Sequence, residues 1–137
     1  MYCNKLRVAV VLFILSSSLP IYAQVRWDGG GGDNQWTNAA NWTNDMLPAS
    51  TDDVLIDNSI ITGNYIIMLP AGMQVVSVKS ISLQPSGTIE LILPASNMAA
   101  PALIISGPGY GLTISDGGIF RNASGISSGT SMQVSDS

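Results

Sequence analysis

Residues 27–57 read WDGGGGDNQWTNAANWTNDMLPASTDDVLID, a loop-rich opening that ends in a short run of valine, leucine and isoleucine. Its tryptophans lie among glycine, asparagine, aspartate and threonine, which favour turns. A segment of this kind needs its own side chains to fix it, and each tryptophan can bury about 150–250 Å². We therefore expect a loop-rich N-terminal cap over residues 24–53, pinned onto β structure by Trp27, Trp36 and Trp42, together with Met46 and Leu47.

The chain begins with the features of a secretory signal peptide. Lys5 and Arg7 give a basic start, and residues 8–15 form an apolar run shorter than the roughly 20 residues that span a bilayer. Small and polar residues follow, and Ala23 is the expected cleavage position. We therefore expect residues 1–23 to be removed and the remainder to be secreted or displayed at the cell surface, without a membrane span after cleavage.

Composition excludes several classes of function. Removal of the signal segment leaves three strong bases, Arg26, Lys79 and Arg121, against nine acids, a net charge of −6. Nucleic acids and anionic lipids need clustered cations, so neither is an expected partner. The one cysteine, Cys3, lies in the signal segment, and the chain has no histidine. Disulfides, Ser-His-Asp triads and zinc sites built from Cys or His are therefore excluded from the mature chain.

After the opening, short runs of alternating apolar residues are separated by turns rich in Gly, Pro, Asn and Asp. Alternation of period 2 with one apolar face predicts β-strands. The predicted strands cover residues 54–56, 65–69, 74–83, 88–93, 102–106, 111–115 and 118–122. The pair Ala39-Ala40 in the opening suggests a single helical turn.

Apolar positions also recur at a longer spacing. Leu83 and Ile105 are 22 residues apart, and Ile89 and Leu112 are 23 apart. A period of this size, with two or three strands in each repeat, is typical of a β-solenoid. We therefore predict an all-β fold, a short parallel β-solenoid resembling a right-handed β-helix, with two or three coils over residues 54–122. The alternative is an antiparallel β-sandwich of about seven short strands.

The opening stretch also fits a longer pattern, W-x-G, then W-x-x-x-x-N-W, then P-x-x-x-D-D-V-x-I. The matching positions are Trp27, Gly29, Trp36, Asn41, Trp42, Pro48, Asp52, Asp53, Val54 and Ile56. This pattern resembles the opening of large secreted surface proteins of Bacteroidetes-type bacteria. The strands that follow, such as VKSISLQPSGTIELIL at residues 78–93, are similar to coils of pectin-lyase-like and adhesin-like β-helices, and loosely to the G8 domain.

The resemblance implies an exported and often very long protein, with adhesion or polysaccharide-handling modules elsewhere in its chain. Residues 123–137 form a polar tail, ASGISSGTSMQVSDS, that supplies no visible cap for a last coil. Proteins of this kind often end in a C-terminal sorting domain, and the tail shows none. We therefore expect the chain to be a truncated part of a longer protein.

Tryptophans are the first candidates for a binding site. The flat faces of Trp27, Trp36 and Trp42 suit stacking on sugar rings, with surface glycans or other cell-surface proteins as partners. The same residues also suit the role of pins between the cap and the first coil. Pinning is the stronger interpretation, because the mature chain has no disulfide and no predicted helix of ordinary length to hold the cap in place.

Aspartates are the second candidates, as oxygen ligands of Ca²⁺, although their spacing fits neither an EF-hand nor the nonapeptide calcium repeat. The candidate ligands are Asp28, Asp33, Asp52 and Asp53. Few acids follow the opening, so a pair of catalytic carboxylates on one strand face is not expected. We predict a non-catalytic structural or adhesive module that needs no cofactor. The alternative is a carbohydrate-binding or polysaccharide-degrading protein whose active part lies outside this chain.

Overall fold

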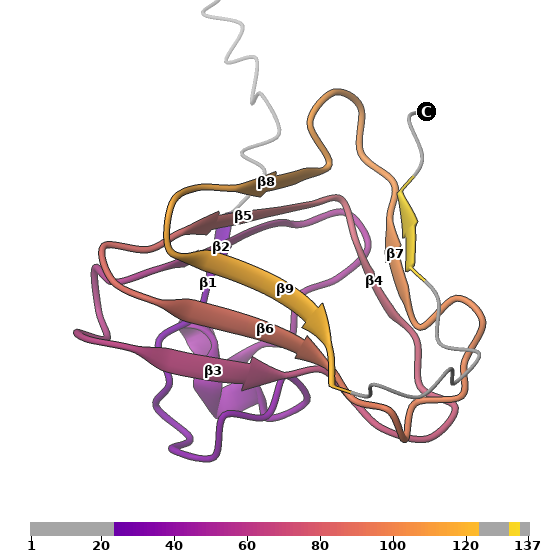
Figure 1. Cartoon of the computed structure of the whole chain (residues 1–137), viewed down its shortest axis with the longest axis horizontal. Helices are drawn as coiled ribbons and strands as arrows, with labels where there is room; N and C mark the ends of the chain where they lie inside the picture. The colour runs from indigo at the N-terminus through magenta and orange to yellow at the C-terminus, as the bar shows by residue number, and fades with distance from the viewer. Residues whose placement is uncertain (1–23, 124–131, 135–137) are drawn as a thin grey trace, which may run out of the picture.

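The computed structural model describes residues 24–123 and the backbone of residues 132–134. All of its strands pair in parallel and stack into a β-solenoid of about four turns (Figure 1). The predicted solenoid is therefore confirmed, and the antiparallel sandwich is wrong. The expected signal peptide, residues 1–23, lies outside the described residues. Within those residues, no helix has the length and hydropathy needed to cross a membrane.

Every strand is short, and two 3₁₀ turns lie between the first two strands. The elements are β1 (Gln24–Arg26), η1 (Ala39–Asn41), η2 (Thr43–Asp45), β2 (Asp53–Asp57), β3 (Tyr65–Met68), β4 (Val76–Val78), β5 (Ser80–Gln84), β6 (Ile89–Leu93), β7 (Leu103–Ile105), β8 (Leu112–Ile114), β9 (Gly118–Asn122) and β10 (Met132–Val134).

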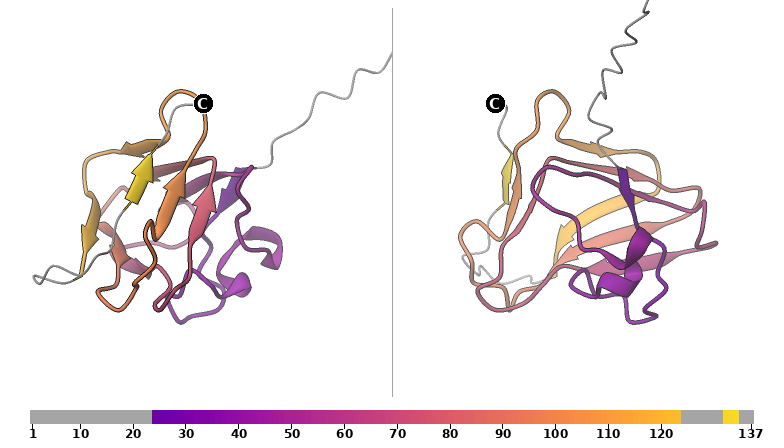
Figure 2. Two further views of the ribbon diagram at one scale, coloured as in Figure 1. Left: turned by 90° about the vertical axis from the view of Figure 1, so that its right-hand side faces the viewer. Right: turned by 180° about the vertical axis from the view of Figure 1, so that it is seen from behind.

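The strands form three parallel sheets around a common bore. The first sheet has the order β1-β2-β5-β8, the second β3-β6-β9 and the third β10-β7-β4. Each coil gives one strand to each sheet, as β2, β3 and β4 do in turn, and β1 adds a first turn beneath the cap. The left view of Figure 2 shows the strands of the third sheet side by side, with the purple cap at one end of the stack.

The spacing of the coils differs from the predicted 22–23 residues. Partner residues of successive coils lie 24 to 31 positions apart, as Tyr65 and Ile89 do at one limit and Ile81 and Leu112 at the other. The equivalence predicted between Leu83 and Ile105, and between Ile89 and Leu112, was therefore wrong, because the corner loops vary in length. The apolar pattern had matched strands that belong to different sheets.

Side chains that alternate along the strands fill the bore. Val54 and Ile81, neighbours in the first sheet, are almost fully buried, as are Ile67 and Leu91 in the second sheet. Leu103 and Ile105 of the third sheet complete the core. Because consecutive strands of one sheet place residues of the same kind in register, the bore becomes a continuous apolar column along the stack.

The predicted strand boundaries are close to the observed ones, with three differences. The run 74–83 is divided into β4 and β5, because the chain turns a corner at Lys79, where the amide donates to the carbonyl of Asp52. The three-residue strand β1 lies in the segment predicted as a loop-rich cap and was not expected, since QVR is too short to show a period. The strand β10 lies in the predicted polar tail and pairs with β7. The predicted helical turn at residues 39–40 is present as η1.

Candidate functional site

The three tryptophans of the opening form one cluster under the cap. Trp42 lies between the other two, with ring centroids 5.0 Å from Trp27 and 4.6 Å from Trp36, in edge-to-face arrangements. Its indole Nε1 donates a 2.8 Å hydrogen bond to the carbonyl oxygen of Trp36. The exposed fractions are 1% for Trp27, 3% for Trp36 and 0% for Trp42, and all three belong to the apolar core.

This burial decides between the two interpretations of the tryptophans. Stacking on a sugar ring needs an exposed aromatic face, and none of the three rings has one in this structure. The rings instead close the end of the bore, as pins of the cap would. The burial of Trp27, Trp36 and Trp42 therefore favours pinning, the stronger interpretation from the sequence, and speaks against stacking on a sugar ring.

Polar side chains fix the loop above the tryptophans. Asp33 accepts hydrogen bonds from the amide of Gln35 at 3.1 Å, from Asn41 Nδ2 at 2.7 Å and from Asn38 Nδ2 at 2.9 Å. These donors, the Gln35 amide foremost, lower the pKa of Asp33 below its ordinary 3.8. Asn41 is fully buried, and its Oδ1 accepts from the amide of Gly31 at 2.9 Å. Asp33 therefore serves as an acceptor within the cap.

The other calcium candidates also have local partners. Asp28 and Asp52 each accept a hydrogen bond from a backbone amide of their own turn, at 3.0 and 2.8 Å. Asp53 accepts a 2.8 Å bond from Lys79 Nζ, and this partner chiefly lowers its pKa. Within residues 24–123, no three acidic, histidine or cysteine side chains gather as a set of metal ligands. Calcium binding stays a prediction for which the four aspartates form no common site.

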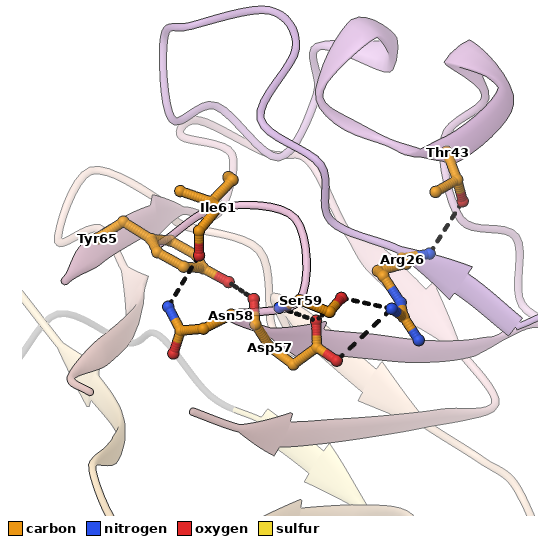
Figure 3. Close-up of polar contacts among 7 residues, drawn as sticks. All are labelled: Arg26, Thr43, Asp57, Asn58, Ser59, Ile61 and Tyr65. Atoms are coloured by element: carbon orange, nitrogen blue, oxygen red, sulfur yellow. Dashed lines mark hydrogen bonds and ion pairs between the residues drawn. The ribbon is translucent and has the colours of Figure 1, made fainter. Parts of the chain in front are cut away.

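Figure 3 shows a second polar group, at the ends of β1 and β2. Arg26 Nη1 lies 3.7 Å from Asp57 Oδ2 and donates to the hydroxyl of Ser59. The phenol of Tyr65, on β3, donates a 2.6 Å bond to the carbonyl oxygen of Asp57. Burial, aided by the charge of Asp57, raises the pKa of Tyr65. The main chain of Arg26 is tied to the cap as well, because its amide donates to Thr43 Oγ1 at 3.1 Å. The group therefore joins the cap, the first turn and the first full coil.

Two further ion pairs join neighbouring coils. Lys79, just before β5, bonds Asp53 of β2, and Arg121 of β9 bonds Glu90 of β6 at 2.8 Å. Asn97 also joins neighbouring coils, through hydrogen bonds inside the molecule. It is fully buried, and its Nδ2 donates to two carbonyl oxygens of the preceding coil, those of Pro70 and Gln74, both at 2.8 Å.

A groove of about 300 Å³ lies between the cap and β4. Its lining combines apolar and neutral polar side chains and includes no charged residue. The lining residues are Trp36, Thr37, Leu47, Pro48, Pro70, Gln74, Val75, Val76 and Ser77. Val75 and Leu47 are half exposed there, whereas Trp36 contributes only a small part of its surface.

The groove runs along a free strand edge. Among the described strands, β4 is the last of the third sheet and pairs only with β7. The amide of Val76 donates to Ala102 on the β7 side. In a parallel strand, the next residue directs its amide and carbonyl to the opposite side. The backbone of Ser77 therefore faces the groove.

The groove was not expected from the sequence. Val75 and Ser77 lie in a run that the alternation assigned to a strand, and the sequence contains no signal that this strand ends a sheet. Leu47 was expected, with Met46, to help pin the cap, and that expectation was wrong: Met46 is 66% exposed, and Leu47 is 45% exposed and lines the groove.

Fold and polar contacts define the class of protein: a capped, three-sheeted parallel β-solenoid whose ion pairs tie one coil to the next. No family model, no curated protein and no solved structure matches the chain. The class therefore rests on the fold and its contacts alone.

Proposed function

We propose that the chain is an exported, non-catalytic structural or adhesive module of a surface protein. The observation that supports the proposal is that its charged side chains form ion pairs between successive coils. Arg26–Asp57, Lys79–Asp53 and Arg121–Glu90 each join strands or corners of successive coils. Carboxylates that could act as acids or bases thus serve as ties along the stack.

A repetitive stack of this kind suits a load-bearing or display role. Each coil contacts its neighbours through backbone ladders, and the side chains at the corners add bonds in the same direction. Asn58 Oδ1, for example, accepts from the amide of Ser86, and Asn64 Oδ1 from the amide of Thr88, both at 2.8 Å. The proposed compartment is supported by the signal-like sequence of residues 1–23.

The adhesive part of the proposal assigns contact with surface glycans or surface proteins to the groove beside β4. Thr37, Gln74 and Ser77 offer hydrogen-bonding groups there, and Leu47 and Val75 offer exposed apolar surface. Mixed polar and apolar linings of this kind are usual for binding clefts.

Export is tested by expressing the full chain in a bacterium and measuring the mass of the product in the medium, the periplasm and the cell-surface fraction. The expected product begins at Gln24. Retention of the whole chain in the cytoplasm, with residues 1–23 still attached, would contradict the proposal.

Adhesion is tested with beads that carry the exported product, flowed over glycan arrays and over layers of cells. Retention should fall at least twofold for Val75→Asp, which puts a charge into the groove. The matched control is Thr113→Asp, at an exposed position of β8 far along the stack, and it should bind as the unchanged chain does. Retention no greater than that of bare beads on every surface would remove the adhesive role.

A further inference from the structure

The outer face of the second sheet is unusually apolar. Strand register places two rows of outward side chains across β3, β6 and β9, in which equivalent positions of successive coils are neighbours. The rows are Ile66–Glu90–Ile119 and Met68–Ile92–Arg121. Four of the six side chains are therefore apolar, although the inward positions of the same strands already supply the core.

Exposure identifies this face as a surface open to a partner. Ile66 is 38% exposed and Ile119 is 40% exposed, and both flank the face. Ile92, at its centre, is only 4% exposed and is not part of the core cluster, so the exposed apolar surface of the face comes mainly from the two flanking isoleucines. In Figure 1 the strands β3, β6 and β9 lie side by side, and no described element lies over them.

The corresponding face of the first sheet has a different composition. Its central row is Leu55–Ser82–Thr113, and its outer positions include the charged Asp53 and Asp57. Two of its three central side chains are thus hydroxyls. The outward rows of the first sheet therefore hold fewer apolar side chains than those of the second, so an apolar outer face does not follow from solenoid geometry alone.

The two charged residues of the apolar face indicate what kind of partner it fits. Glu90 and Arg121 form a 2.8 Å ion pair, with side-chain exposures of 26% and 48%. The face therefore presents one negative and one positive group, side by side, among isoleucines. It offers no aromatic surface for a sugar ring, because Phe120, the aromatic residue of β9, packs against the core.

We infer that this face binds the same face of a second copy of the chain. Under a two-fold axis between the faces, Glu90 of each copy lies opposite Arg121 of the other, and the isoleucines pack together. Sheets that pack face to face lie about 10 Å apart, a distance that isoleucine side chains fill. A face of three short strands is small beside stable interfaces, which bury about 1,200–2,000 Å², so the dimer should be weak and dependent on concentration.

The test exploits the two charges. Sedimentation equilibrium of the exported product should show the average mass rising toward twice that of one chain as the concentration increases. Glu90→Arg gives a face with two positive charges, and Arg121→Glu gives one with two negative charges. Each variant alone should stay monomeric, and an equimolar mixture should associate at least tenfold more tightly than either variant by itself.

Controls separate the interface from effects on folding. Thr113→Arg adds a charge to the outer face of the first sheet on the last coil, and it should leave self-association unchanged. Thermal unfolding checks that each variant is folded. If a charge variant fails to fold, Ile119→Ser replaces it, since that side chain is already 40% exposed, and it should abolish dimerisation.

Several results would overturn the inference. They are a monomer at every concentration of the unchanged chain, dimerisation that survives each charge reversal alone, and a mixture that associates no better than its components. Loss of the dimer in Thr113→Arg, with the charge variants unaffected, would place the interface on the first sheet instead.

Discussion

Trp42 is the residue on which the cap most depends. It contacts both other tryptophans, is fully buried, and donates its indole hydrogen to Trp36. We expect Trp42→Ala to lower the free energy of unfolding by about 3–5 kcal/mol, because a large cavity opens where the cap meets the bore. Urea denaturation followed by tryptophan fluorescence and circular dichroism measures the loss.

The matched control for this prediction is Met46→Ala, in the same cap. Met46 is 66% exposed, so its truncation should change the stability by no more than about 0.5 kcal/mol. A Trp42→Ala chain as stable as the Met46→Ala chain would mean that the cap does not depend on the tryptophan cluster.

Buried asparagines show where residue-level prediction from sequence fails. Asn41 and Asn97 are both fully buried, and the sequence predicts burial for neither of them, although Asn41 belongs to the opening pattern, because asparagine is common in exposed turns. Each is buried because its amide satisfies backbone groups that the turns leave unpaired. Asn97 also accepts from the amide of Ala99 at 2.8 Å, so both ends of its side chain are used.

At the scale of elements, the corner between β4 and β5 illustrates how one coil is fixed to the next. The carbonyl of Asp52 accepts from the amide of Lys79, and the carboxylate of Asp53 accepts from Lys79 Nζ and from Ser80 Oγ at 2.6 Å. Backbone and side chains thus bond the same corner to the preceding coil.

This corner makes the stability of the folded chain depend on pH in the acid range. The bond from Lys79, followed by that from Ser80, lowers the pKa of Asp53 below its ordinary 3.8. A carboxyl whose pKa is lower in the folded chain stabilises it above the unfolded value, and this contribution is lost as the pH falls through the folded value. We expect the urea midpoint to be steady near neutral pH and to fall below about pH 4.

Two variants test whether the ion pair between Asp53 and Lys79 causes this dependence on pH. Asp53→Asn should reduce the midpoint at neutral pH and flatten its fall in acid, and Lys79→Met should flatten it similarly, because the partner is the main cause of the shift. The remaining slope should come in part from Asp33, whose pKa is lowered in the same direction. An unchanged acid slope in Lys79→Met would show that the ion pair is not responsible.

Turns between strands are stacked as closely as the strands themselves. Gly117 has a φ of +83°, and its backbone lies so near the carbonyl oxygen of Gly87, one coil earlier, that an added Cβ would overlap that oxygen. The sequence predicted turns at both glycines. That they belong to the same corner of the solenoid was visible only in the fold.

At the scale of the whole molecule, the four aspartates proposed as calcium ligands hold separate turns and corners. Each of them accepts hydrogen bonds from protein groups nearby. We therefore expect the same melting temperature in millimolar calcium as in a chelator, as measured by circular dichroism. A rise of several degrees in calcium would indicate a metal site that involves groups beyond these local bonds.

The sequence by itself determined the class of the fold. Alternating apolar residues in short runs predict strands wherever one side of each strand faces a core, and the turn residues between them set the boundaries to within a few positions. Clustered tryptophans in a chain without disulfides indicated a pinned cap. These features are local, and each is expressed within a few neighbouring residues.

Only the tertiary structure decided how the coils align and which surfaces remain open. Coil lengths vary, so register depends on pairing between residues 24 to 31 positions apart, which a search for a fixed period cannot find. The free edge of β4 and the apolar outer face of the second sheet both follow from that register. The physical reason is that exposure depends on which strands stack above and below a residue, and the local sequence does not specify those neighbours.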